Sequence, residues 1–203
     1  MSLTESIGRS DGRQALSDDG TVVTAAGLLR DGQIIPVSWN GRLLARISAD
    51  GSTLVFETAT FQSCLGGALF KAGWYTGTLD VVHVSTGTTL RLETNASLTS
   101  TTPGPSCDAR PYYQPSISND GRRVLFRWSD SPSGPQQAVV ARIASARARG
   151  GRRVLTAEPS GIVEVVLSGD GHLAFAVTGG GGLLSINVDS GSVERLLPNA
   201  GPW

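Results

Sequence analysis

The amino-acid sequence predicts an all-β fold, a β-propeller or a fragment of one, with about four blades of antiparallel strands. Three observations predict this class. One turn motif followed by an apolar strand occurs four times, at spacings that leave room for about four strands per unit. Short apolar segments alternate with Asp-Gly, Asn-Gly and Ser/Thr-Gly pairs, which are typical of hairpins. The 203 residues include 26 glycines and 10 prolines, which indicates many turns.

The repeated turn has the pattern apolar-Ser-x-Asp-Gly, most plainly in residues 117–126, Ile-Ser-Asn-Asp-Gly-Arg-Arg-Val-Leu-Phe. We expect a structural role, because the Asp carboxylate can accept hydrogen bonds from nearby backbone N–H groups while Gly adopts a positive φ. We also expect the turn to carry the chain from the outer strand of one blade to the inner strand of the next. The turn residues are Asp19, Gly20, Asp50, Gly51, Asp120, Gly121, Asp170 and Gly171.

The first two units follow this turn with short apolar segments. In the second unit, a Gly- and aromatic-containing insertion is expected at 59–77, and a loop rich in Ser, Thr and Pro at 94–111. Alternating apolar positions between turn pairs favour antiparallel hairpins. The strands expected in these units are 22–26, 33–39, 42–48, 54–58, 79–84 and 88–93.

The third and fourth units repeat the scheme. The hairpin at 183–196 echoes the one at 79–92, since both turn at Ser/Thr-Gly and end in Arg-Leu. We expect three strands in the fourth unit and a hairpin loop at the glycine run 179–182. The strands expected here are 112–117, 124–128, 138–143, 153–156, 162–167, 173–177, 183–188 and 193–197.

Residues 1–12 are polar and are expected to form a flexible lead-in, followed by a single propeller domain at 13–203. Four units are few for a propeller. The chain is therefore a complete four-bladed ring closed by pairing 13–17 with 193–197, one half of a homodimeric ring, or a fragment of a longer propeller protein. We favour the fragment.

Composition excludes some functions. Seventeen basic residues balance seventeen acidic ones, so no overall field draws the chain to nucleic acid. No apolar run is long enough to span a membrane. The first residues lack the features of a signal peptide, and we expect one to have been removed from a periplasmic or extracellular protein.

Two cysteines, Cys64 and Cys107, are too few for a disulfide scaffold or a four-cysteine zinc site. Both lie in loop-like contexts, so a bridge between them and two free thiols remain open alternatives. If the bridge forms, the protein is extracytoplasmic.

The sequence lacks the motifs that are typical of catalytic and metal-binding sites. It has no Gly-x-Ser-x-Gly motif, and His83 and His172 have no nearby partner of the kind that binds metal. No Asp-x-Asp-x-Asp calcium loop surrounds Asp189. We therefore nominate no catalytic residue, no metal and no cofactor.

Aromatic residues on loops are the best candidates for recognition, because exposed aromatics contribute strongly to interfaces. These are Trp74 and Tyr75 in the insertion and Trp128 at the end of a strand; packing onto the blade is the alternative. An arginine cluster at one hairpin tip is expected to be a solvated loop, with an anion site as the alternative. Its members are Arg142, Arg147, Arg149, Arg152 and Arg153.

The order Ser-x-Asp-Gly, short Val/Leu-x-Phe strand, then apolar hairpin ending in Arg-Leu resembles the TolB-type, WD-repeat-like propeller repeat of bacterial proteins. The resemblance covers residues 16–197, although that family usually has Pro before the Asp. A repeat along the whole chain without a set of catalytic groups indicates a non-catalytic binding or scaffold module for a protein or glycan. The alternative is the propeller portion of a larger enzyme, such as a peptidase or other hydrolase, whose catalytic residues lie outside this chain.

Overall fold

The computed structural model describes residues 17–24, 27–36, 42–63, 73–99, 115–129, 135–145 and 148–198. Within these ranges every regular element is a β-strand, and the strands form one three-stranded and three four-stranded antiparallel sheets. The all-β class and the four blades predicted from the sequence are confirmed. The described part contains no helix of the length and hydropathy needed to cross a bilayer.

Each sheet is one blade, and the strands in each are consecutive in the chain. Blade 1 consists of β1 (Val22–Thr24), β2 (Gly27–Arg30) and β3 (Gln33–Pro36). Blade 2 consists of β4 (Arg42–Ile47), β5 (Thr53–Ser63), β6 (Gly73–His83) and β7 (Thr89–Thr99). Blade 3 consists of β8 (Ser116–Ile117), β9 (Arg123–Trp128), β10 (Gln137–Ser145) and β11 (Ala148–Ala157). Blade 4 consists of β12 (Ile162–Leu167), β13 (Leu173–Thr178), β14 (Leu183–Asn187) and β15 (Val193–Leu197).

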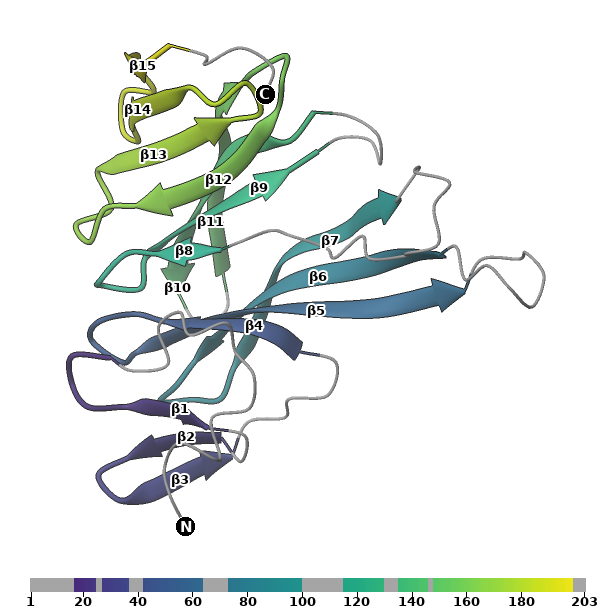
Figure 1. Cartoon of the computed structure of the whole chain (residues 1–203). Helices are drawn as coiled ribbons and strands as arrows, with labels where there is room; N and C mark the ends of the chain where they lie inside the picture. Colours follow the sequence, from purple (N-terminus) through teal and green to yellow (C-terminus); the bar gives the residue numbers. More distant parts are fainter. Residues whose placement is uncertain are drawn as a thin grey trace.

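The blades are arranged in chain order as an open fan, with β3 and β15 at its opposite ends (Figure 1). Three apolar clusters lie between successive blades. One joins blade 1 to blade 2, one joins blade 2 to blade 3, and one joins blade 3 to blade 4. Because side chains alternate along a strand, each inner blade contributes one set of residues to the preceding cluster and the other set to the next.

The expected path of the chain through the repeated turn was wrong. The turn joins two neighbouring strands of one blade, as the pairs Ile47 with Leu54 and Ile117 with Val124 show. In blades 2, 3 and 4 the strand before the turn is thus the first strand of the same blade. β12, which precedes the fourth turn, therefore belongs to blade 4. Blade 4 has four strands, one more than expected.

The insertion and loop expected in blade 2 are also partly wrong. Part of each segment is strand instead. β5 extends to Ser63, β6 begins at Gly73 and β7 extends to Thr99, and the three strands are paired along this length. Sequence reasoning also missed β2, a short strand without strong alternation. The glycine run 179–182 does lie in a hairpin loop, between β13 and β14.

Candidate functional site

The repeated turn has the same hydrogen bonds in its second, third and fourth copies, and in the first copy one N–H, that of Thr21, makes both backbone bonds. In the third copy, the Ser118 hydroxyl donates to Asp120 Oδ1 at 2.6 Å, and the Arg122 N–H donates to the same oxygen at 3.0 Å. The Arg123 N–H donates to Ser118 Oγ at 3.0 Å. Equivalent bonds connect Ser17, Asp19 and Thr21; Ser48, Asp50, Ser52 and Thr53; and Ser168, Asp170, His172 and Leu173.

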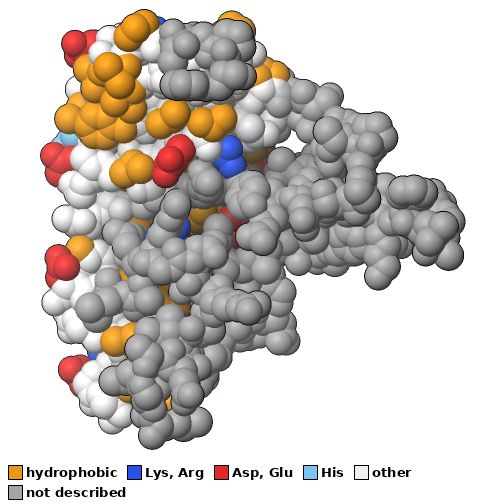
Figure 2. Space-filling model, in the orientation of Figure 1, with side chains coloured by type: hydrophobic (Ala, Val, Ile, Leu, Met, Phe, Trp, Pro, Cys, Tyr) orange, Lys and Arg blue, Asp and Glu red, His pale blue; other side chains and the backbone are white. Residues whose placement is uncertain are grey.

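Backbone hydrogen bonds connect the turns of successive blades into a row along one edge of the fan. Asp18 N–H donates to Ala49 O at 2.9 Å, Asp50 N–H to Asn119 O at 3.2 Å, and Asn119 N–H to Gly169 O at 2.7 Å. Acidic side chains are spaced along this edge, at the left of Figure 2. The row of turns fixes the spacing of the blades.

The turn carboxylates are engaged within their own turns. Hydrogen bonds from the Ser168 hydroxyl and the His172 N–H lower the pKa of Asp170. Burial acts to raise the pKa of Asp50, but hydrogen bonds from Ser48 and Ser52 outweigh it and hold that pKa below its ordinary value. In the described part of the chain, no three His, Cys, Asp or Glu side chains lie close enough to hold a metal ion.

A second cluster forms around Asp189, at the junction of blades 3 and 4. Arg123 Nη2 lies 2.8 Å and Arg142 Nη2 lies 3.3 Å from Asp189 Oδ1, and His172 Nδ1 lies 2.5 Å from Asp189 Oδ2. The hydrogen bond from His172 and that from Arg123 lower the pKa of Asp189 to about 2. Arg153 donates to the backbone oxygens of Val188, Asp189 and Ser190 at 2.7–3.3 Å.

Three of the five arginines expected at the hairpin tip therefore have partners within the chain. Arg142 and Arg153 contact the β14–β15 turn, and Arg152 pairs with Glu93 at 2.8 Å. Arg147 and the side chain of Arg149 lie outside the described residues. Arg152 thus connects blade 3 to blade 2, and Arg142 and Arg153 connect blade 3 to blade 4.

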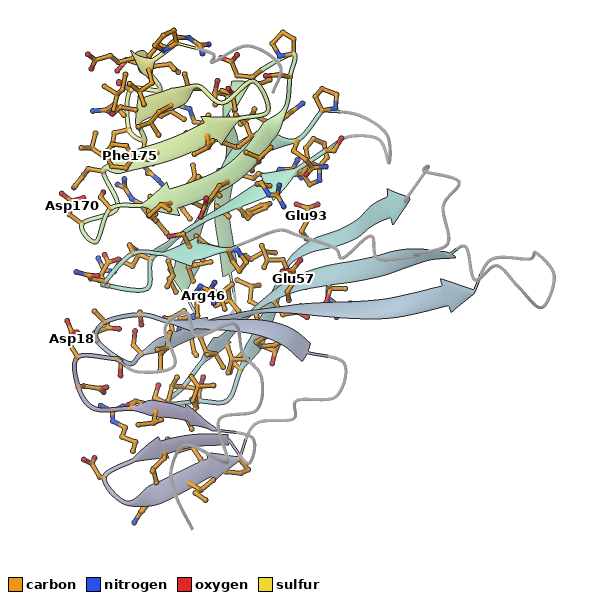
Figure 3. The ribbon with its side chains drawn as sticks, in the orientation of Figure 1. Asp18, Arg46, Glu57, Glu93, Asp170 and Phe175 are labelled. Carbon is orange, nitrogen blue, oxygen red and sulfur yellow. The ribbon has the colours of Figure 1, made fainter. Side chains whose placement is uncertain are left out.

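Trp128 lies half-buried at the end of β9, against the cluster between blades 2 and 3. The guanidinium of Arg152 covers its ring, with Arg152 Cζ 4.0 Å from the ring centroid. Glu93 of blade 2, labelled in Figure 3, forms an ion pair with that guanidinium. Such a stacked, ion-paired arginine stabilises a junction by cation–π attraction.

Trp74 and Tyr75 lie on β6, the third strand of the four-stranded blade 2 sheet. In register, Trp74 is opposite Gln62 and Thr99, and Tyr75 is opposite Phe61 and Leu98. The expectation of a recognition role for these aromatics remains a prediction. Cys64 and Cys107 lie outside the described residues.

Two buried charged residues were not predicted from the sequence. Glu57 and Arg127 are buried and occupy the same repeat position, directly after Phe56 and Phe126. Arg127 Nη1 donates to Val163 O of blade 4 at 2.9 Å. A charge next to the repeated Phe is the one signal that could have located these residues.

No family model and no curated protein matches the chain. Among solved structures, the β-propeller domain of the Trilobed protease from Pyrococcus furiosus is similar, with a TM-score of 0.52 and 14% identity over 80% of this chain and 45% of that one. A puromycin-hydrolyzing peptidase from Mycobacterium tuberculosis has a TM-score of 0.54 and 13% identity over 88% of this chain and 28% of that one.

TolB from Acinetobacter baumannii is a third similar structure, with a TM-score of 0.45 and 16% identity over 76% of this chain and 32% of that one. The chain therefore spans less than half the length of the three. The two peptidase structures share the β-propeller fold with this chain, and at these identities the likeness concerns the fold alone.

Proposed function

We propose that the chain is a non-catalytic binding or scaffold module that recognises a protein or glycan through the long three-stranded arm of blade 2. The length of that arm is the observation that carries the proposal. β5, β6 and β7 each have 11 residues, whereas β13, β14 and β15 have 6, 5 and 5. Blade 4 packs on blade 3 with these shorter strands, so packing between blades does not by itself account for the length of the arm.

The arm extends beyond the other sheets, at the right of Figure 1. Pairing of β4 with β5 ends at Thr58, whereas pairing of β5 with β6 continues to Ser63. Among the described strands, residues 59–63 of β5 and 94–99 of β7 thus pair on one side only. Such edges can receive a strand of a protein partner, and the aromatic residues of β6 add contact area.

The test is capture of envelope proteins and glycans on the immobilised chain. Replacing residues 61–75 by Asn-Gly would join Thr60 to Thr76, which are directly opposite in register, through a tight hairpin turn. We expect this variant and the double substitution Trp74→Ala, Tyr75→Ala to lose at least about 10-fold in partner affinity, as for interface hot spots.

A matched control is Val154→Ala, an exposed apolar residue on β11 of blade 3, outside the arm. It should leave capture unchanged, and all variants should retain the thermal unfolding midpoint of the parent chain within a few degrees. Undiminished capture by the shortened arm would contradict the arm as the recognition element.

A TolB-type binding module of bacteria would act in the periplasm or outside the cell. We propose this location, and a Cys64–Cys107 disulfide would support it. The mass of the chain after thiol alkylation, with and without prior reduction, tests the bridge.

A second function is favoured by the two solved structures with the same fold that belong to peptidases. In this alternative, the chain is the propeller part of a larger enzyme, such as a peptidase or other hydrolase, whose catalytic groups lie elsewhere. The complete gene discriminates the two: a neighbouring hydrolase domain would support the enzyme, and adhesion-type domains after a signal peptide would contradict it.

A further inference from the structure

The exposed hydrophobic side chains are concentrated on one blade. Of the eight large hydrophobic residues exposed in the described part of the chain, six lie in blade 4. Figure 2 shows hydrophobic side chains gathered over the sheet β12–β15. A contiguous apolar patch marks an interaction surface, whereas scattered apolar residues do not. The six residues are Val163, Val166, Leu173, Val193, Leu196 and Leu197. By register Val166, Leu173 and Leu197 share one face of the sheet, whereas Val193 lies opposite the buried Ile186 on the other face.

The last strand of blades 2, 3 and 4 has a β-bulge at the same place, and the residue skipped by the pairing is always leucine. These are Leu92, Leu155 and Leu196. Leu92 packs against blade 3 and is 1% exposed, and Leu155 packs against blade 4 and is 7% exposed. Leu196 is 43% exposed. The same side chain at the same position is buried wherever a further blade follows.

Two more positions repeat this pattern. Phe175 of β13, labelled in Figure 3, corresponds to Val55 and Leu125, each five residues after the Asp of its turn. Val55 and Leu125 are fully buried by the following blade, whereas Phe175 is only half-buried.

Leu183 of β14 corresponds in register to Leu79 and Ala138, which are also fully buried. We call Phe175, Leu183 and Leu196 the forward face of blade 4.

Blade 1 also has an uncovered face, the one that points away from blade 2. Val23, Leu28 and Ile35 form the row that faces blade 2. The alternate row is Val22, Leu29 and Ile34, also in direct register, and Ile34 is 56% exposed. We call this row the rear face of blade 1.

We propose that the forward face of blade 4 docks on the rear face of blade 1 of a second copy of this chain, so that two copies close a ring of eight blades. All three junctions within the chain join a forward face to a rear face, and the new junction continues them. The two free faces lie at opposite ends of the open fan and do not meet within one copy (Figure 1). Eight blades lie within the usual range for propellers, and a two-fold ring leaves no face uncovered.

The first test is the mass of the full chain in solution by light scattering at about 50 µM, a concentration at which interfaces of ordinary affinity are occupied. We expect about 42 kDa, twice the 21.1 kDa of one chain. Leu196→Asp and, as a second variant, Leu183→Asp should weaken association at least about 100-fold, because an unpaired carboxylate would be buried in the junction. Val154→Asp is the matched control: Val154 is 44% exposed but lies on blade 3, so this substitution should leave the mass unchanged.

The second test separates this head-to-tail junction from other pairings. Ile34→Asp should also give monomers, and mixing it with Leu196→Asp should restore a dimer through the one intact junction. A circular dichroism spectrum like that of the parent chain shows that the variants fold. A monomeric parent chain overturns the proposal and leaves a blade outside residues 1–203 as the occupant. A dimer that is insensitive to Ile34→Asp overturns it in favour of a face-to-face pairing of two blades 4.

Discussion

The forward faces of blades 3 and 4 carry corresponding residues in different surroundings. Leu155 of blade 3 is buried against blade 4, whereas Leu196 of blade 4, at the same bulge, is exposed. Both sheets have the same strand order, and each outer strand skips one residue at its bulge. The difference shows that the apolar surface of a blade is a property of the repeat, while its burial depends on whether a neighbour is present.

The largest expected effect contrasts these two leucines. Leu155→Ala should lower the free energy of unfolding by about 3 kcal/mol, because it leaves a cavity in the core. Leu196→Ala should lower it by less than about 1 kcal/mol in a dilute solution of monomers, because little buried surface is lost. Urea unfolding at low protein concentration measures both. Equal losses for the two variants would contradict the contrast.

The turn row offers a second contrast between covered and uncovered positions. Gly121 has a φ of +66° and its added Cβ would collide with Thr53 of the preceding blade, whereas Gly20 has a φ of +81° and open space around it. Gly121→Ala should therefore lower the free energy of unfolding by about 2 kcal/mol and Gly20→Ala by about 1 kcal/mol. Thermal unfolding of the two variants side by side tests this order, and a larger loss for Gly20→Ala would reverse it.

The arginine pairs provide a smaller contrast. Arg152 lies at the junction of blades 2 and 3, over Trp128 and beside Glu93, and Arg195 lies on the uncovered outer strand with Glu158 as a partner. Arg152→Met should lower the free energy of unfolding by about 1 kcal/mol, since cation–π attraction is lost. Arg195→Met should lower it by less than about 0.5 kcal/mol, as for exposed ion pairs. Denaturant titrations in low and high salt measure both.

The smallest effect concerns Asp189, whose exposed carboxylate joins blades 3 and 4. Its pKa is about 2 in the folded chain and has an ordinary value of 3.8. A carboxyl group with a lowered folded pKa stabilises the fold above its unfolded pKa, and this contribution is lost as pH falls from about 4 to about 2. Asp189→Asn should thus destabilise the chain at neutral pH and make its stability less sensitive to pH in that window. Unfolding midpoints measured from pH 2 to 7 test this, and parallel curves for the two proteins would contradict it.

The sequence predicted the elements whose cause is local. Asp120 and Gly121 specify a turn through one carboxylate and one positive φ, so four copies of the motif were enough to predict four blades. The path of the chain through the turn was wrong, because the motif does not state which strand lies beside which. β2 and the long strands of blade 2 were missed for a related reason: their pairing comes from neighbouring strands rather than from their own alternation.

The candidate sites were less accessible to sequence reasoning. Trp128 was chosen as an aromatic at the end of a strand, but Arg152 and Glu93, which are distant in the sequence, decide its surroundings. Asp189 gains its partners from three other strands or turns. Contacts of this kind depend on how the blades are stacked, and no spacing along the chain encodes them.

The sequence by itself determined the repeat, the turns and the all-β class, because each follows from hydrogen bonds and backbone angles within a few residues. Only the tertiary structure decided which apolar residues are core and which are surface. Leu92, Leu155 and Leu196 have the same place in the repeat, and they differ because burial requires a second surface that the strand itself cannot provide.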